Sequence, residues 1–266
     1  MSGLPEPTVA LSEEQIAFYR KNGYLAIDQI TTTEEIERTR AACDGLFTRR
    51  AGREEGMEFD LAGTDEDDTK PTLPQIMEPR NYSQALKNTQ YESNAINISK
   101  QLLGNGIEQR GSHAIFKPAG YGAATPWHQD EACWNPKKNY NSISVWMPLQ
   151  EATLENGCMQ FIPGSHRLEV LNHHHIDHNP KVQGLELDED QVDLSNAVAC
   201  PLPSGGATIH GGRVLHYTSP NISDTPRRAF ILLFHVPQPP PETRRDFYWQ
   251  NKTKTFSAEK REATKT

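Results

Sequence analysis

The run RRAFILLFHVP, residues 227–237, is mainly aliphatic and aromatic and opens with two arginines. Similar short runs precede it from about Glu108 onward, separated by glycine, proline and asparagine. They are EQRGSHAIFKP, NSISVWMPLQ, GCMQFIPG, NAVACPLP and GATIHGGRVLHYT. Short apolar runs between turn residues are typical of antiparallel sandwiches and barrels. We therefore predict a mainly β core, either a sandwich or a barrel-like jelly roll, with helices packed outside it.

Three stretches before these runs have the pattern of helices. The first, LSEEQIAFYRKNGYLAI, has Ser12 as a candidate N-cap, two acids in the first turn and Gly23 as a stop. The second is TTTEEIERTRAACDGLFTRR, and the third, YESNAINISKQLLGNG, ends near Gly104. We expect each to form a helix on the outside of the β core.

Three polar stretches are predicted to be irregular. The glycine-rich segment within residues 51–82 and the insert at 167–195 are expected to be loops over the site. The insert carries His173, His174, His175 and His178, which we interpret as solvated loop residues, with an adventitious metal tract as the alternative. The charged stretch 251–266 is predicted to be a flexible C-terminal tail.

The bulk composition favours one domain, residues 1–266, and excludes several kinds of partner. Lys plus Arg total 27 against 35 for Asp plus Glu, a net charge of −8, which argues against nucleic acid. No apolar run approaches the roughly 20 residues that span a bilayer, and no signal peptide is recognisable at the N-terminus. Four scattered cysteines indicate reduced thiols in a cytoplasmic protein.

The stretch WHQDEACW, residues 127–134, is a candidate metal site. On a strand, His128 and Asp130 would point to the same side, about 6–7 Å apart along the chain, so both could reach one ion. The alternatives are exposed polar residues on a strand, a hydrogen-bonded core histidine, or a turn. A metal needs a further ligand, and among the ten histidines His210 and His216 are rivals for that position.

The residues after His216 favour it over His210. The segment HYTSPNISDTPRRAF has the pattern of a strand end, a turn and a returning strand that begins with arginines. A ligand there would have a guanidinium nearby, and arginine binds carboxylates through two parallel hydrogen bonds. Two histidines and one carboxylate on one face of a metal are typical of non-haem iron(II) oxygenases.

On these residues, the chain resembles the phytanoyl-CoA dioxygenase family of iron(II) and 2-oxoglutarate-dependent oxygenases. The matching segments are NGYLAI, FKPAGYGAATPWHQD, WMPLQEATLENGCMQFIPGSH and HYTSPNISDTPRRAF, in family order over roughly residues 11–237. The resemblance implies a double-stranded β-helix (jelly roll, cupin-like). It also implies Fe(II) as the metal and 2-oxoglutarate and O2 as cosubstrates.

Carried over by position, the resemblance implies His128, Asp130 and His216 as iron ligands. The residues implied around 2-oxoglutarate are Arg227, Thr218, Trp146 and Lys117, with core packing as the alternative for Trp146 and a surface position for Lys117. Trp134 resembles a substrate-side aromatic residue. Tyr217 replaces the glycine that the family has after the distal histidine, and it could narrow the pocket mouth. Strand alternation turns Arg228 to the other face, where we expect a structural role.

The implied reaction is oxidation of a small organic metabolite, with release of succinate and CO2. The carboxylate at Asp130 favours hydroxylation, or a related desaturation or ring closure, over halogenation, because the related halogenases carry a small residue there. The loops 51–82 and 167–195 are poor in Lys and Arg, which argues against a coenzyme A thioester. The competing functions are a cupin-like metal hydrolase or isomerase without 2-oxoglutarate, and a non-catalytic binding protein.

Overall fold

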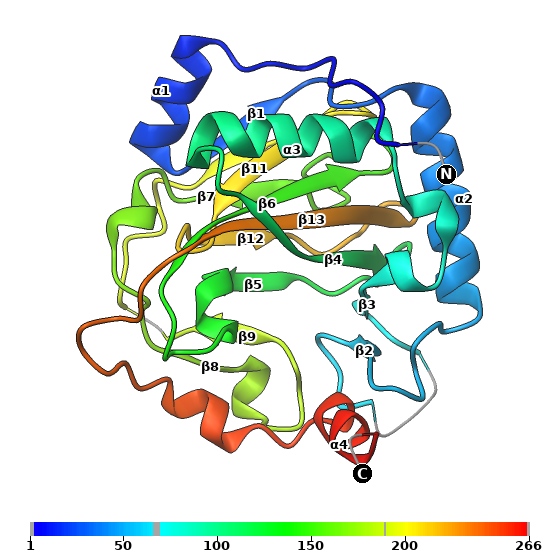
Figure 1. Cartoon of the computed structure of the whole chain (residues 1–266). Helices are drawn as coiled ribbons and strands as arrows, with labels where there is room; N and C mark the ends of the chain where they lie inside the picture. Colours follow the sequence, from blue (N-terminus) through cyan, green and yellow to red (C-terminus); the bar gives the residue numbers. More distant parts are fainter. Residues whose placement is uncertain (1–2, 66–69, 189, 265–266) are drawn as a thin grey trace.

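The computed structural model describes residues 3–65, 70–188 and 190–264. Its centre consists of two antiparallel sheets (Figure 1). The larger sheet has seven strands in the order β1-β11-β6-β13-β4-β3-β2, and the smaller has four in the order β10-β7-β12-β5. A separate ribbon pairs β8 with β9. Four α-helices flank the sheets, so the predicted mainly β fold with outer helices is confirmed.

Each helix and strand has defined bounds. The helices are α1 Glu13–Asn22, α2 Thr33–Thr48, α3 Gln90–Leu103 and α4 Phe256–Ala263. The strands of the larger sheet are β1 Tyr24–Ile27, β2 Glu58–Asp60, β3 Pro74–Met77, β4 Glu108–Lys117, β6 Tyr140–Pro148, β11 Ala207–Gly211 and β13 Arg227–Pro237. The remaining strands are β5 Thr125–His128, β7 Met159–Phe161, β8 His173–His175, β9 Leu185–Leu187, β10 Val198–Cys200 and β12 His216–Thr218.

Local sequence accounts for the helix ends. The Ser12 hydroxyl accepts from the Gln15 N–H, and the Gln15 side chain accepts from the Ser12 N–H, which is a capping box. Gly23 then ends α1 in the left-handed region at φ 83, which glycine adopts without strain. α2, α3 and α4 each begin with a threonine cap whose hydroxyl accepts a backbone N–H. The three helices predicted before residue 108 are confirmed.

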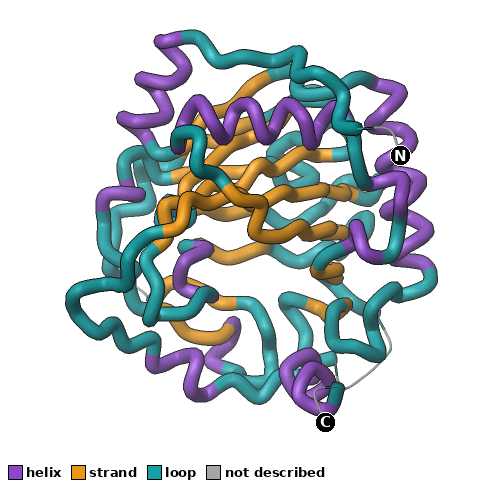
Figure 2. The backbone as a smooth tube through the Cα atoms, viewed as in Figure 1, coloured by secondary structure: helices purple, strands orange, loops and turns teal. Residues whose placement is uncertain are grey.

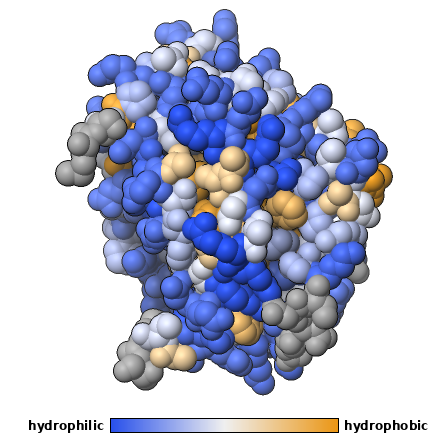
Figure 3. All heavy atoms as spheres, turned by 90° about the vertical axis from the view of Figure 1, so that its right-hand side faces the viewer, coloured by the Kyte–Doolittle hydropathy of each residue, from blue (hydrophilic) through white to orange (hydrophobic). Residues whose placement is uncertain are grey.

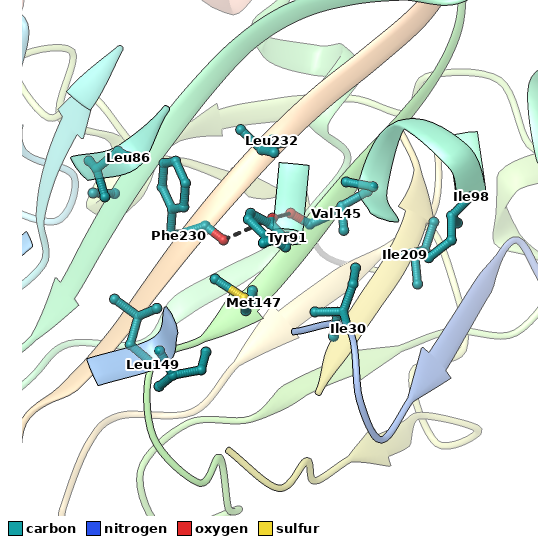
Figure 4. Packing of buried hydrophobic residues seen from close by; sticks show 14 of the residues in the cluster. Ile30, Leu86, Tyr91, Ile98, Val145, Met147, Leu149, Ile209, Phe230 and Leu232 are labelled. Atoms are coloured by element: carbon teal, nitrogen blue, oxygen red, sulfur yellow. Dashed lines mark hydrogen bonds between the residues drawn. The ribbon is translucent and has the colours of Figure 1, made fainter. Parts of the chain in front are cut away.

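The larger core lies between the outer helices and the seven-stranded sheet. α3 crosses the outer face of this sheet (Figure 1), and its Tyr91 is buried there. The Tyr91 hydroxyl donates to the Val145 carbonyl at 2.6 Å, next to the ring of Phe230 (Figure 4). This contact satisfies the phenol inside an otherwise apolar layer that includes Met147, and it fixes α3 across β6 and β13.

A second core lies between the two sheets. It joins Trp146 and Ile231 of the larger sheet to Met159 and Phe161 of the smaller one. Two antiparallel sheets that pack face to face on a shared buried layer have the double-sheet architecture of jelly rolls. The strands gather in the middle of the molecule, with loops and short helices around them (Figure 2).

The three stretches predicted to be irregular contain more structure than expected. Residues 51–82 contribute β2 and β3 to the edge of the larger sheet, and residues 66–69 lie outside the described residues. The stretch 251–264 contains α4, whose cap Thr255 and first-turn Ser257 are buried and donate to Gln183 Oε1. The prediction of an unstructured tail is therefore wrong for these residues, while residues 265–266 lie outside the described chain.

The prediction of a solvated histidine tract is wrong for His173 and His175, whereas His178 is exposed. His173 and His175 lie on β8 and are buried, because strand alternation turns both to the inner side. His175 donates from Nδ1 to the Val182 carbonyl, and its Nε2 lies 3.2 Å from the Thr253 hydroxyl. His174 points outward between Glu186 and Asp188. His173 and His175 each have hydrogen bonds at both ring nitrogens. These bonds offset the cost of desolvation, which made the burial of polar side chains here unexpected.

The surface is strongly polar. The face in Figure 3 is mostly hydrophilic, with small separate hydrophobic areas, in line with a mean hydropathy of −0.70. Within the described residues, every helix is too short or too polar to cross a bilayer.

Candidate active site

Three side chains of types that bind metals meet where two strands of the smaller sheet lie side by side. β5 ends at His128, which lies opposite His216 at the start of β12. The chain then turns into a 3-10 helix that begins with Asp130. One ligand atom from each of the three residues lies within 4.8 Å of the other two. Asp130 Oδ1 is 3.7 Å from His128 Nε2 and 3.6 Å from His216 Nε2.

Both imidazoles are oriented by the backbone. His128 Nδ1 donates to the Pro126 carbonyl at 2.8 Å, and His216 Nδ1 donates to the Val214 carbonyl at 2.9 Å. These bonds fix the proton on Nδ1 and leave the Nε2 lone pair of each ring turned toward Asp130 Oδ1. Metal-bound histidines in proteins are held by such outer hydrogen bonds. The donor set therefore fits a divalent metal that takes two nitrogens and one oxygen.

The second oxygen of Asp130 is held from the opposite sheet. Ser144 on β6 donates its hydroxyl to Asp130 Oδ2 at 2.8 Å. His210, the cross-strand partner of Ser144 on β11, has its Nε2 3.6 Å from the same oxygen. The carboxylate thus presents Oδ1 to the two histidines of the smaller sheet. His210, the rival third ligand, is buried behind the carboxylate rather than beside Oδ1.

The electrostatics of the cluster suit metal binding. Burial alone would raise the pKa of Asp130, but His216, His128 and His210 together hold it well below its usual value. Burial, followed by the neighbouring His128, lowers the pKa of His216 well below its ordinary value. An anionic carboxylate and a neutral imidazole are the protonation states that bind a cation.

A cavity of about 490 Å³ opens in front of these ligands. Arg227, at the start of β13, lies at one end of it and is only 1% exposed. Its Nε and Nη1 atoms are buried and have no hydrogen-bond partner within the described chain. Burial lowers the pKa of Arg227 to about 9. A buried guanidinium with free donors fits a carboxylate that arrives with a ligand, since such groups are otherwise paired.

Two other residues expected around the cosubstrate line the same end. Thr218 is buried, and its hydroxyl donates to the Thr125 hydroxyl at 3.0 Å. The Arg227 guanidinium carbon lies 5.4 Å from the centre of the Trp146 ring. Trp146 also belongs to the core between the sheets. Its position therefore agrees both with contact to 2-oxoglutarate and with plain core packing.

Lys117 occupies a different position from the one expected. It is fully buried, so the surface alternative is wrong. Its ammonium donates to the carbonyls of Ala123, Thr218 and Ser219 at 2.7, 3.2 and 2.7 Å. An ammonium has three hydrogens, and here all of them are used by the backbone. Lys117 therefore ties the end of β4 to the strand of the distal histidine, and it is not among the residues that line the cavity.

The remaining predicted residues divide between the cavity and the outside. Trp134 lines the cavity, and its ring lies against the guanidinium of Arg110. Tyr217 does not line it; alternation along β12 turns this side chain away, where it stacks on Trp127 at 5.3 Å. The prediction that Tyr217 narrows the pocket is therefore wrong. Arg228 points to the other face of the larger sheet and pairs with Asp44 on α2, as predicted.

Several cavity residues were missed by sequence reasoning. Arg110 and His113 on β4 and Arg261 on α4 all line the cavity. Burial lowers the pKa of His113 to about 4, so it is a neutral wall residue. Polarity does not alternate along β4 near His113, so the sequence gives no local signal for this residue. No local signal marks Arg261, because α4 approaches the cavity from the end of the chain.

The histidine tract also supports the candidate metal ligands. Gln129, between the two ligands of the H-x-D motif, donates its backbone N–H to His173 Nε2 at 3.1 Å. The Gln129 side-chain oxygen accepts from the Leu171 N–H, and its nitrogen donates to the Arg213 carbonyl. The insert at 167–195 is therefore bound directly to the backbone that presents His128 and Asp130.

Comparison with known proteins gives a consistent assignment. A family model described as phytanoyl-CoA dioxygenase (PhyH) matches residues 19–229. The phytanoyl-CoA dioxygenase domain-containing protein 1 homolog of Dictyostelium discoideum is 28% identical, with 84% of this chain and 91% of that protein covered. A probable alpha-ketoglutarate-dependent hypophosphite dioxygenase of Stutzerimonas stutzeri is 26% identical, with coverage of 83% and 77%.

Solved structures share the fold along most of the chain. The crystal structure of EvdO2 from Micromonospora carbonacea var. aurantiaca, complexed with 2-oxoglutarate, has a TM-score of 0.77 and 34% sequence identity. The match covers 92% of this chain and 99% of that one. EctD from S. alaskensis, in its apoform, has a TM-score of 0.67 at 19% identity, with 93% and 88% covered, and shows the shared fold.

Proposed function

The chain belongs to the phytanoyl-CoA dioxygenase (PhyH) family, and on this premise we propose that it is an Fe(II)- and 2-oxoglutarate-dependent dioxygenase. It would hydroxylate an unactivated C–H bond of a small organic metabolite and release succinate and CO2. One observation carries the proposal. The cavity that holds the cluster of His128, Asp130 and His216 also holds Arg227, a buried guanidinium with unpaired donors.

The three ligands each have a defined task. His128 and His216 would bind iron through Nε2, and Asp130 through Oδ1. The outer hydrogen bonds to Pro126, Val214 and Ser144 keep these atoms in place. When bound, iron with 2-oxoglutarate and O2 supplies the oxidising chemistry, so the protein needs no acid or base of its own for that step. The carboxylate at position 130 supports hydroxylation over halogenation.

Arg227 would bind the carboxylate of 2-oxoglutarate that is remote from the metal, with Thr218 and Trp146 beside it. A bidentate bond to a carboxylate would use donors that otherwise stay buried and unpaired. The 2-oxoglutarate complex of EvdO2, at 34% identity, supports 2-oxoglutarate as a ligand of this chain. Trp134, which lines the cavity beside Arg110, would lie on the substrate side.

We also propose that residues 1–266 act as one catalytic domain. The C-terminal segment places Arg261 in the cavity although it lies beyond the family match at 19–229. The four cysteines are free thiols, which supports a reducing compartment such as the cytoplasm.

The competing function is a cupin-like metal hydrolase or isomerase that does not use 2-oxoglutarate. It would share the metal ligands but would have no need for a buried guanidinium beside them. Arg227 therefore favours the oxygenase. A binding protein without turnover could use Arg227 in the same way, so metal-dependent release of succinate is the observation that separates it from the oxygenase.

The direct test measures conversion of 2-oxoglutarate to succinate in air by the Fe(II)-loaded protein. We expect slow succinate formation without substrate, stimulation by the true substrate among candidate metabolites, and none with Zn(II) or in Asp130→Ala. Arg228→Gln is the control for a substitution outside the site, since Arg228 pairs with Asp44 on the other face of the sheet and is not among the residues that line the cavity. Succinate formation that is equal with and without iron would contradict the proposal.

A further inference from the structure

A second arginine lines the cavity that also holds Arg227. Arg110 lies on β4, the strand whose last residue, Lys117, pairs with Arg227 across the sheet. At about 3.3 Å per residue, Arg110 and Lys117 are on the order of 20 Å apart along this strand. Both arginines nevertheless line the same cavity. Arg227 and Arg110 therefore lie toward opposite ends of this strand, and the candidate metal ligands and Arg261 line the same cavity.

A β-bulge turns Arg110 toward the cavity. β4 and β13 pair in register from Lys117 to Gly111, which lies opposite Leu233; the next partner of β13, Phe234, is Gln109. Arg110 is therefore the extra residue of a bulge. By alternation, Gly111, His113 and Ile115 face the cavity, and the bulge adds Arg110 to the same face. Bulges near active sites commonly redirect one side chain in this way.

Aromatic rings hold the Arg110 guanidinium in place. Its central carbon lies 3.9 Å from the centre of the Trp134 ring and 4.5 Å from that of Tyr140. Ring contacts stabilise the charge but use none of the N–H donors. Arg110 Nη1 is buried and has no hydrogen-bond partner within the described chain. The guanidinium is thus held rigidly, with a donor still available.

Nearby acids are already engaged. Glu131 is buried and paired with Arg213 and Arg245. Asp130 faces the histidines and Ser144, and a metal would take its remaining charge. Glu78, also on the cavity wall, accepts from the Ser112 N–H and hydroxyl. Within the described residues, Arg110 forms no ion pair, although the protein carries a net charge of −8.

We propose that Arg110 binds an anionic group of the substrate, and that the substrate is a small organic carboxylate or similar oxyanion. Its apolar part would rest on the wall formed by Phe59, Met77 and Leu185. Arg261, the third arginine on the cavity wall, already donates to the Gly56 carbonyl, whereas Arg110 keeps an unpaired donor. One available cation of this kind suits one negative charge rather than a polyphosphate. The inference rests on the proposed function, because it assigns this end of the cavity to the substrate and the other to 2-oxoglutarate.

The test uses benzoate and benzamide, which have nearly the same shape and differ in charge. Each is titrated into anaerobic Fe(II) protein saturated with 2-oxoglutarate, so that Arg227 is occupied, and the apparent Kd is taken from the rise in Tm. The proteins are wild type, Arg110→Gln, Arg110→Lys and the control Arg228→Gln. Arg110→Lys keeps the positive charge but lacks the planar guanidinium that lies against Trp134 and Tyr140. It remains informative should the glutamine variant not fold.

We expect benzoate to bind the wild type at least about tenfold more tightly than Arg110→Gln, the loss for one buried charge-assisted hydrogen bond. Arg110→Lys should lie between them, Arg228→Gln should match the wild type, and benzamide should not discriminate. A benzoate Kd that differs less than threefold between the wild type and Arg110→Gln overturns the proposal. Benzoate that binds to the metal instead of Arg110 would give this result. Absence of benzoate binding in every protein also overturns it. Succinate formation is measured in a separate assay. Failure of the proposed function can therefore be distinguished from failure of the proposal for Arg110.

Discussion

Ser144 and Asp130 are joined by a 2.8 Å hydrogen bond that links the two sheets at the metal site. The serine belongs to the larger sheet and the carboxylate comes directly after a strand of the smaller one. Because the hydroxyl occupies Oδ2, Oδ1 is left facing His128 and His216. The position of the carboxylate is thus set by the packing of one sheet on the other.

Removing this hydroxyl should weaken metal binding. In Ser144→Ala we expect the Kd for Fe(II), or for Mn(II) as a stable substitute, to rise about tenfold, the lower end for loss of an outer hydrogen bond to a ligand. Metal titration by calorimetry measures it. Ser142→Ala is the matched control, since this buried hydroxyl on the same strand has no hydrogen-bond partner within the described chain. Equal metal affinity in Ser144→Ala and the wild type would rule out this role.

Arg227→Gln should lose affinity for 2-oxoglutarate and retain the metal. The substitution removes the positive charge and one of the two parallel N–H donors of the guanidinium. Loss of a buried charge-assisted hydrogen bond costs on the order of 2 kcal/mol of binding free energy, or about thirtyfold in Kd. Arg227→Lys should recover only part, because an ammonium cannot form two parallel bonds to a carboxylate. Binding of 2-oxoglutarate to the Mn(II) protein provides the measurement. Unchanged affinity in the glutamine variant would assign the cosubstrate to another cation.

Acid should destabilise the protein through buried histidines. Burial lowers the pKa of His173 to about 4, from 6.5 for the free side chain. Below pH 6.5 the unfolded chain therefore binds more protons than the folded protein does. The contribution of neutral His173 to the free energy of unfolding is fully present above that pH and is lost as pH falls toward 4. For His173 alone the loss between pH 7 and pH 5 is on the order of 2 kcal/mol.

Urea unfolding at a series of pH values measures this loss. His173→Gln should have a shallower pH dependence than the wild type, whereas His178→Gln should not, because His178 is exposed. The same glutamine variant should also bind metal more weakly, since His173 accepts the N–H of Gln129 between two ligands. Parallel pH profiles in all three proteins would disprove the contribution of His173.

Gly212→Ala should disturb the substrate end of the cavity. A Cβ at this position would lie 2.8 Å from two ring carbons of Trp134, which supports Arg110. We expect a loss of about 1–3 kcal/mol in stability from overpacking, together with weaker benzoate binding and unchanged affinity for 2-oxoglutarate. Gly45→Ala on α2 is the control, because a Cβ there meets no atom within 4 Å and the helix should gain slightly. Benzoate binding equal to that of the wild type would show that Trp134 does not position Arg110.

The candidate ligands His128 and Asp130 stand out in the local H-x-D pattern, and Arg227 in a strand that opens with arginines. His216 could be selected over His210 only from the turn and strand pattern that follows it. Ser144 has no such signal, since its role depends on which residue of β6 faces Asp130 across the sheets. Arg110 faces the cavity because a bulge shifts the alternation of side chains along β4. Prediction from sequence assumes a regular alternation, so it assigns Arg110 to the opposite face. The buried positions of Lys117 and His173 were missed for a related reason. Their polar atoms are satisfied by backbone groups far away in the chain, which composition does not reveal.

The central claim is that iron and 2-oxoglutarate bind together between the H-x-D motif, His216 and Arg227. The absorption spectrum of the anaerobic Fe(II) protein, recorded as 2-oxoglutarate is added, tests it most directly. We predict a visible metal-to-ligand charge-transfer band in the wild type and in Arg228→Gln, absent in His216→Ala and shifted to much higher 2-oxoglutarate concentration in Arg227→Gln. Iron that binds stoichiometrically to the wild type without any such band would contradict the account.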